Sequence, residues 1–174
     1  MANPSKARGT RWESAIRDYL NGVLGYSHPT DWRLVKRQAQ EGAKDVGDLH
    51  AWPFILEAKD VKSPAVPTWL RQAEVEAVNA GFPYGVVIHK VRGKGPALAR
   101  VHISDATYRR IWRDHPDVWA AGLTAVANMR YGYCTWTLAE FAQVLAAVRA
   151  TESISVASFA QPDTRVFVEP PVND

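Results

Sequence analysis

Three side chains between residues 46 and 60 have the types and spacing that metal-dependent hydrolysis needs. Asp48 lies near the start of one short apolar segment, and Glu57 and Lys59 lie at the end of the next, after a Trp-Pro turn. Side chains two positions apart on a strand leave by the same face, so Glu57 and Lys59 point together. If the two strands pair as neighbours, Asp48 comes to the same end of that face. Two carboxylates and an amine on rigid strands can hold a hard divalent cation and a water molecule.

The same residues have a simpler interpretation. Charged residues are common on a half-exposed strand, and neighbouring Glu and Lys side chains often form a solvated ion pair of little energetic value. The apolar run 54–56 (Phe-Ile-Leu) favours the catalytic interpretation, because it predicts a buried strand that leads directly to Glu57. A carboxylate close to a core is costly unless it is paired or binds a metal. We therefore interpret Asp48, Glu57 and Lys59 as a candidate phosphodiesterase site.

This spacing resembles the signature of the PD-(D/E)xK nucleases. Gly47 and Asp48 match its first half, with glycine where the motif name has proline, and Glu57-Ala58-Lys59 matches its second half. A superfamily member of this kind is expected to be a metal-dependent nuclease with a restriction-endonuclease-like fold.

A second segment resembles one particular branch of this superfamily. Residues 8–13 (Arg-Gly-Thr-Arg-Trp-Glu) resemble the helix opening of the archaeal and phage Holliday junction resolvases of that superfamily, in which a Glu on the first helix completes the metal site. Glu13 occupies the matching place. Thr10 and Glu13 also form a capping-box pattern, so a structural role for Glu13 is an alternative. The whole resemblance covers about residues 8–103.

The resemblance implies a Mg²⁺-dependent DNA endonuclease, in which Mn²⁺ can substitute. The implied metal ligands are Asp48, Glu57, Glu13 and the backbone carbonyl of Ala58. Lys59 would orient the attacking water or stabilise charge that builds on phosphorus. Related nucleases often carry a Gln on the helix after the motif that helps to orient the site, and Gln72 has that place; an ordinary surface Gln is the alternative. The exonuclease pattern, a Gln followed four residues later by Tyr, is absent because Glu76 stands there.

DNA is the implied partner, most specifically a branched four-way junction. Two cuts on opposed strands require two sites, so the resolvase assignment also implies a homodimer. Two alternatives stay open: a nuclease of this fold that acts on other DNA, in flap cleavage, restriction or repair, and a catalytically silent DNA-binding module. The substrate preference would distinguish a nuclease that acts on other DNA from a resolvase. Metal-dependent cleavage would exclude the silent DNA-binding module.

The charge distribution is compatible with a polyanionic partner. Residues 1–103 hold 15 Lys and Arg against 10 Asp and Glu, whereas residues 104–174 hold 6 against 8. The motif therefore lies in the basic part of the chain, which would attract DNA. An ordinary mixed surface is the alternative. The candidate DNA contacts are Arg8, Arg11, Lys36, Arg37, Lys44, Lys62 and Lys94.

Composition predicts one soluble domain. The 174 residues are 47% hydrophobic and 22% charged, which is ordinary for a globular protein. No apolar run approaches the roughly eighteen residues of a membrane span, and residues 1–9 lack the apolar region of a signal peptide. The single cysteine, Cys134, excludes an internal disulfide. We expect a cytoplasmic protein of a bacterial, archaeal or phage-infected cell.

Hydrophobic periodicity and turn residues predict an α/β fold, and the resemblance implies that its core is restriction-endonuclease-like. We expect a central mixed β-sheet of about five strands, flanked by helices, and a C-terminal helical addition. The predicted helices are 10–24, 68–80, 105–113 and 138–149, and the predicted strands include 31–37, 84–89 and 97–103. Strands 54–59 and 84–89 should be parallel, because helix 68–80 makes the crossover between them.

The predicted domain organisation follows these elements. Residues 1–9 form a flexible basic arm, and residues 10–150 form a single nuclease domain. Within this domain the catalytic core spans about 10–103 and the helical addition spans 104–150. Residues 151–174 form a loosely held C-terminal tail, with one possible strand at 165–168.

Overall fold

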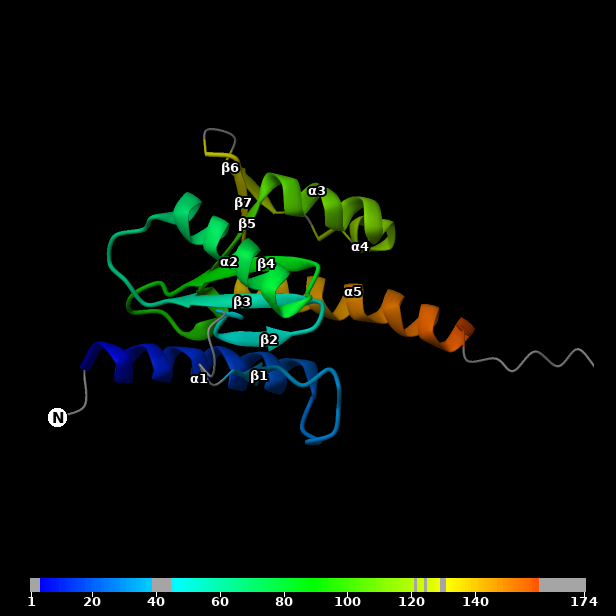
Figure 1. Cartoon of the computed structure of the whole chain (residues 1–174), viewed down its shortest axis with the longest axis horizontal. Coiled ribbons are helices and arrows are strands. Elements are labelled where there is room, and N and C mark those ends of the chain that lie inside the picture. Colours follow the sequence, from blue (N-terminus) through cyan, green and yellow to red (C-terminus); the bar gives the residue numbers. More distant parts are fainter. Residues whose placement is uncertain (1–3, 39–44, 121, 124, 129–130, 160–174) are drawn as a thin grey trace, which may run out of the picture.

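The structure is a computed structural model that describes residues 4–38, 45–120, 122–123, 125–128 and 131–159 (Figure 1). Its helices are α1 (Pro4–Leu24), α2 (Val66–Ala80), α3 (Asp105–Asp114), α4 (Pro116–Ala120) and α5 (Leu138–Phe159), with a short 3₁₀ turn, η1, at Pro96–Leu98. Its strands are β1 (Lys36–Arg37), β2 (Leu49–Ala51), β3 (Phe54–Lys59), β4 (Tyr84–His89), β5 (Arg100–Ser104), β6 (Val126–Asn128) and β7 (Tyr133–Thr137).

The strands form one mixed sheet in the order β1-β2-β3-β4-β5-β7-β6. Strands β3 and β4 are parallel, as the intervening helix α2 predicts, and the other neighbouring pairs are antiparallel. The α/β class and the mixed sheet flanked by helices are thus confirmed. The expected number of about five strands is too low for the described residues, which contain seven.

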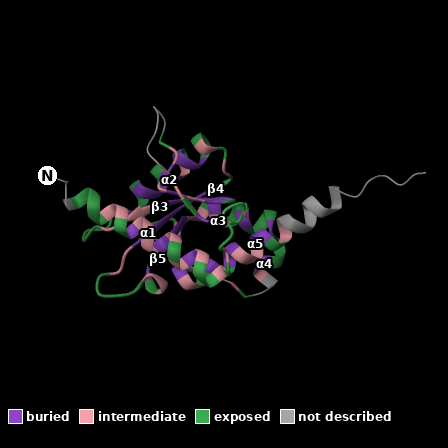
Figure 2. Cartoon of the chain, turned by 90° about the horizontal axis from the view of Figure 1, so that it is seen from below, coloured by how far each residue is buried: buried purple, intermediate pink, exposed green. Residues whose placement is uncertain are grey.

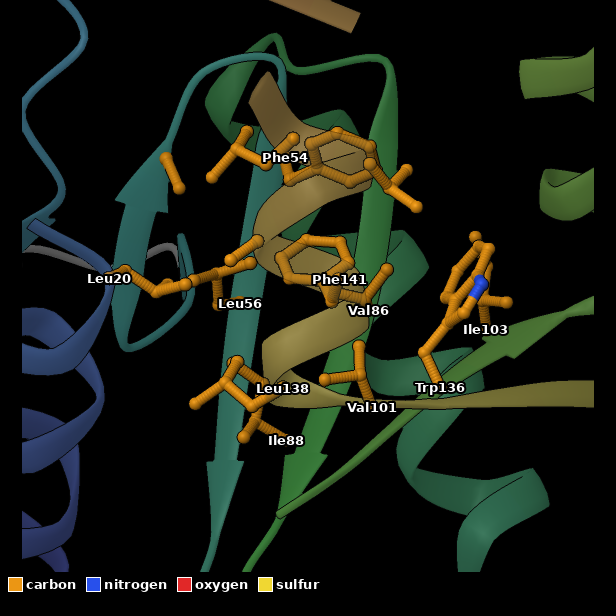
Figure 3. Packing of buried hydrophobic residues seen from close by; sticks show 14 of the residues in the cluster. Leu20, Phe54, Leu56, Val86, Ile88, Val101, Ile103, Trp136, Leu138 and Phe141 are labelled. Carbon is orange, nitrogen blue, oxygen red and sulfur yellow. The ribbon is translucent and has the colours of Figure 1, made fainter. Parts of the chain in front are cut away.

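Alternation along the central strands separates two faces of the sheet. Phe54 and Leu56 on β3, with Val86 and Ile88 on β4, enter the main core, which α1 and α5 cover (Figure 3). The intervening side chains point to the other face, where α2 packs a smaller cluster around Trp69. Figure 2 shows the buried strands enclosed between the partly exposed helices. Glu57 and Lys59 belong to the face under α2, because they alternate with the core residues of β3.

Helix α1 begins earlier than the sequence pattern suggests. It starts at Pro4, so the expectation of a flexible arm over residues 1–9 is wrong for residues 4–9. Proline is well tolerated in a first helical turn, because the N–H that it lacks has no partner there, and Lys6-Ala7-Arg8 are good helix formers. Thr10 therefore lies inside the helix and does not cap it. The capping-box alternative for Glu13 is wrong.

Two predicted strands have different bounds in the structure, because turns replace part of each strand. The predicted strand 31–37 shrinks to β1, because Asp31 accepts hydrogen bonds from the backbone N–H groups of Arg33, at 2.9 Å, and Leu34, at 3.1 Å, which make a turn. The predicted strand 97–103 begins with η1, and β5 continues to Ser104. Ser104 then caps α3 by accepting from the N–H of Thr107 at 3.1 Å.

The C-terminal part of the chain also departs from the prediction. The expected helical addition over 104–150 also contains two strands, β6 and β7, which extend the sheet beside β5. The capping box of Thr137 and Glu140 does open α5, with Thr137 N–H donating to Glu140 Oε2 at 2.7 Å and Glu140 N–H donating to Thr137 Oγ1 at 3.2 Å. The helix continues to Phe159, so residues 151–159 are helical and not a loose tail. The possible strand at 165–168 lies outside the described residues.

A hydrogen bond joins helix α5 to the β2–β3 hairpin, which carries the candidate site. The buried Arg149 donates from Nε to the carbonyl of Trp52, at 2.6 Å, in the turn between β2 and β3. Within the described parts of the chain, no helix combines the length and the apolar character needed to cross a membrane.

Candidate active site

Asp48 and Glu57 come together through the register of the β2–β3 hairpin. Leu49 pairs with Leu56 in this antiparallel ladder, and one further step along the same register sets Asp48 beside Glu57. Asp48 Oδ2 accepts a hydrogen bond from the backbone N–H of Ala58 at 2.8 Å. The hairpin therefore gathers the two candidate acids on the face that α2 covers.

Gly47 shapes the chain as it enters this hairpin. Its φ of +81° lies in the left-handed region, which proline cannot adopt because its ring fixes φ near −65°. A Cβ at this position would also lie 2.4 Å from Ile55 Cγ2. Glycine therefore suits this backbone conformation, which directly precedes Asp48.

Lys59 and Gln72 both contact Glu57. Lys59 Nζ donates a hydrogen bond to Glu57 Oε1, and Gln72 Nε2 donates to the same oxygen at 3.0 Å. Gln72 Oε1 in turn accepts from Lys59 Nζ at 3.3 Å. Three side chains from β3 and α2 thus form a closed ring of hydrogen bonds, which includes the Gln that sequence reasoning could have treated as ordinary surface.

Glu76 is the residue that sequence reasoning missed. It lies one helical turn after Gln72, and its Oε1 accepts a hydrogen bond from Gln72 Nε2 at 2.8 Å. The side chain is only 1% exposed, and it interacts directly with the carboxyl of Glu57 as well as with Gln72. The i,i+4 spacing from Gln72 was the available signal, because residues at that spacing share one helix face.

Burial and mutual repulsion disfavour the charged forms of the site carboxyls. Burial, followed by the negative charge of Glu57, raises the pKa of Asp48 to about 7. Burial also raises the pKa of Glu57 to about 7, with Glu76 adding to the shift and Lys59 opposing it. The pKa of Glu76 is raised as well, first by burial and then by the charges of Asp45 and Asp48. A cation at this position would relieve all three carboxyls.

These shifts predict how stability depends on pH. The folded-state pKa values of Asp48 and Glu57 lie above their ordinary values of 3.8 and 4.5, so between about pH 4 and pH 7 the folded protein binds more protons than the unfolded chain. The free energy of unfolding in EDTA should therefore fall as pH rises through this window, by up to ~1.4 kcal/mol per pH unit for each group. Urea unfolding at several pH values should give a shallower slope for Asp48→Asn. An unchanged slope would contradict this assignment of the protons.

Glu13 has a different partner from the one that its expected role requires. Arg37 donates from Nε, at 2.9 Å, and from Nη2, at 2.7 Å, to Glu13 Oε2. This ion pair joins α1 to β1, and the side chain of Glu13 is 17% exposed. Glu13 contributes to the site through its charge, which adds to the raised pKa of Asp48. Arg37, a candidate DNA contact, is held by this pair.

The remaining candidate DNA contacts lie at the surface. Lys44 falls outside the described residues, whereas the others are exposed. Those exposed residues are Arg8, Arg11, Lys36, Lys62 and Lys94. Their positions are compatible with contact to an anionic partner.

The donor chemistry of the site suits a hard cation, but the described residues contain no arrangement of three or more His, Cys, Asp or Glu side chains around one metal position. Asp48 and Glu57 supply carboxylate oxygens, the type of ligand that Mg²⁺ prefers. The raised pKa values of Asp48, Glu57 and Glu76 show that three acidic groups are buried and repel one another in this region. The residues thus fit a cation by chemistry and electrostatics.

No protein-family model, curated protein or solved structure was found to match this chain. Any function proposed for the chain must therefore rest on the geometry and chemistry of Asp48, Glu57, Lys59 and Gln72, together with the sequence resemblance.

Proposed function

We propose that this chain is a metal-dependent DNA endonuclease of the PD-(D/E)xK type. The observation that carries the proposal is the convergence of Asp48, Glu57 and Lys59 on one face of the β2–β3 hairpin, with Gln72 of α2 bound to two of them. The raised pKa values of Asp48 and Glu57 support it further, because perturbed carboxyls gather where a protein needs a charge or a cation.

Under this proposal Mg²⁺ would be held by Asp48, Glu57 and the backbone carbonyl of Ala58. When bound, the cation would supply neutralisation of the phosphate charge and activation of water near neutral pH. Glu13 would act on the metal site through its charge and not as a direct ligand, because its carboxylate is already paired with Arg37 at 2.7 Å.

The side chains around the acids would have distinct tasks. The Lys59 amine, which contacts Glu57 from the same face of β3, can donate to a water or to charge developing on a phosphate oxygen. Gln72 holds both Glu57 and Lys59, so it limits the positions that the amine can reach. Rigid strands and the overlying helix keep this geometry before substrate arrives.

The resemblance to the archaeal and phage resolvases narrows the proposed substrate to a branched four-way DNA junction. Paired cuts across a junction need two active sites, so the resolvase proposal includes a homodimer. The exposed candidate cations would contact phosphates without reading sequence.

Cleavage of three labelled DNAs tests the proposal: a four-way junction, a matched duplex and a single strand, each with Mg²⁺, using the native protein and Asp48→Asn. We expect paired nicks in the junction, little cutting elsewhere, and no cutting by the variant. If the native protein cuts all three DNAs equally and Asp48→Asn cuts none, the nuclease proposal stands and the resolvase proposal is wrong. No cutting in either Mg²⁺ or Mn²⁺ would reject the nuclease and leave the DNA-binding module.

A further inference from the structure

The amide of Gln72 bridges two carboxylates. Its single Nε2 donates to Glu57 Oε1 at 3.0 Å and to Glu76 Oε1 at 2.8 Å, so both N–H groups are used. Its carbonyl oxygen accepts from Lys59 Nζ at 3.3 Å. The amide therefore has three fixed neighbours, and Glu76 is the one that lies outside the Asp48–Glu57–Lys59 set.

We propose that Glu76 is a positioning residue: it holds the Gln72 amide in the orientation that presents N–H to Glu57 and the carbonyl oxygen to Lys59. Without Glu76, the amide would keep Glu57 as its one acceptor and the longer contact with Lys59 Nζ at 3.3 Å, so its orientation would be less restrained. The second acceptor, on the same helix face, fixes the plane of the amide. The effect on cleavage rests on the proposed function, whereas the restraint on the amide does not.

The burial of Glu76 argues against a role in packing alone. The side chain is 1% exposed, it lies against the carboxyl of Glu57, and burial raises its pKa. A carboxyl in these surroundings costs stability that leucine, of similar size, would not. A positioning role thus predicts that Glu76→Leu keeps or raises stability while the Gln72 amide becomes less ordered. A packing role predicts that leucine, which fills a similar volume, leaves the amide unmoved.

Glu74 offers a matched control on the same helix. Its Oε1 accepts hydrogen bonds from the hydroxyls of Ser104 and Thr107, the latter at 3.1 Å, on the side of α2 away from the Gln72–Glu76 contact. Glu74→Leu should lower Tm, because it leaves two hydroxyls without their acceptor, and it should leave the Gln72 amide and the turnover unchanged.

The experiment combines a structural and a kinetic measurement on the full chain. The Gln72 side-chain amide is followed by ¹H–¹⁵N NMR without metal or DNA and is assigned by its loss in Gln72→Ala. Turnover and KM for the most rapidly cleaved DNA are measured with Mg²⁺. The variants are Glu76→Leu, Glu76→Gln, Glu74→Leu, and Glu76→Leu combined with Gln72→Ala.

We expect Glu76→Leu to shift the Gln72 amide resonances and to lower kcat about tenfold, with KM unchanged. Glu76→Gln keeps an acceptor and should retain most of the turnover. In the Gln72→Ala background, Glu76→Leu should change kcat less than about twofold, because the residue acts through the amide.

The two proposals fail in different ways. Unmoved amide resonances in Glu76→Leu, or a larger loss of Tm than in Glu74→Leu, would overturn the positioning role even if the native protein cleaves DNA. Shifted resonances in a protein that cleaves no DNA would uphold the restraint on the amide and reject the nuclease.

Discussion

Glu57→Gln is expected to lose at least ~10³-fold of metal-dependent DNA cleavage and yet to resist urea better than the native protein at pH 8. Under the proposed function, the substitution removes a charged oxygen ligand of the metal. A metal ion contributes several kcal/mol of charge stabilisation in the transition state, and about 1.4 kcal/mol corresponds to a tenfold change in rate. Glu57 is also bound by Lys59 and Gln72, so the change disturbs the groups that orient the amine.

The gain in stability follows from the raised pKa of Glu57. Burial raises this pKa to about 7, so at pH 8 the folded protein must carry a charge that its surroundings disfavour. A neutral glutamine of the same shape removes that cost, although it also gives up the ion pair with Lys59. The gain should disappear near pH 5, where the native carboxyl is protonated in the folded protein.

A capping residue far from the site is a suitable control for this result. Glu140→Gln alters the capping box at the start of α5 and should lower stability by no more than ~1 kcal/mol, with cleavage unchanged. Cleavage by Glu57→Gln at a rate close to that of the native protein would contradict the metal-ligand role. Equal losses of stability at pH 5 and pH 8 would contradict the assignment of the raised pKa.

Gly85→Ala should destabilise the fold by about 3 kcal/mol or more and should reduce cleavage even in the protein that stays folded. A Cβ at Gly85 would lie 2.3 Å from the carbonyl oxygen of Ala73, in the middle of α2. The obstructing atom belongs to a helix backbone, so β4 and α2 must separate. Gln72 immediately precedes Ala73, so this displacement also moves the amide away from Glu57.

Gly95→Ala is the matched substitution. Nothing lies within 4 Å of a Cβ built at Gly95, and its φ of −72° suits any residue, so stability and cleavage should stay unchanged. Urea unfolding monitored by circular dichroism measures both variants, and cleavage is compared below the unfolding transition. A loss of less than ~1 kcal/mol in the free energy of unfolding of Gly85→Ala would contradict this prediction, because it would mean that α2 can move away from β4 at little cost.

The local pattern was sufficient for the elements that carry the site. The apolar run 54–56 followed by Glu-Ala-Lys predicted a buried strand with its charges at one end, and β3 spans Phe54–Lys59. The crossover through α2 predicted parallel strands, and β3 and β4 are parallel. These predictions succeed because side-chain alternation and the handedness of βαβ units depend on local chain geometry.

The pattern was misleading where two local interpretations compete. Thr10 and Glu13 match a capping box, but the helix already begins at Pro4 and Glu13 pairs with Arg37. The segment from 104 to 150 contains clear helix signals that concealed β6 and β7. Short strands at the end of a sheet are stabilised by their neighbours, so their own sequence carries a weak signal.

The sequence by itself determined the α/β class, the hairpin with its acids and amine, and the helix that covers them, because each depends on periodicity and turn chemistry over a few residues. Only the tertiary structure decided which side chains meet across elements. The pairing of Glu13 with Arg37 and the contact of Gln72 with Glu57 depend on how α1 and α2 pack on the sheet. Packing brings together residues far apart in the chain, and it also decides which carboxyls lose water and so acquire raised pKa values.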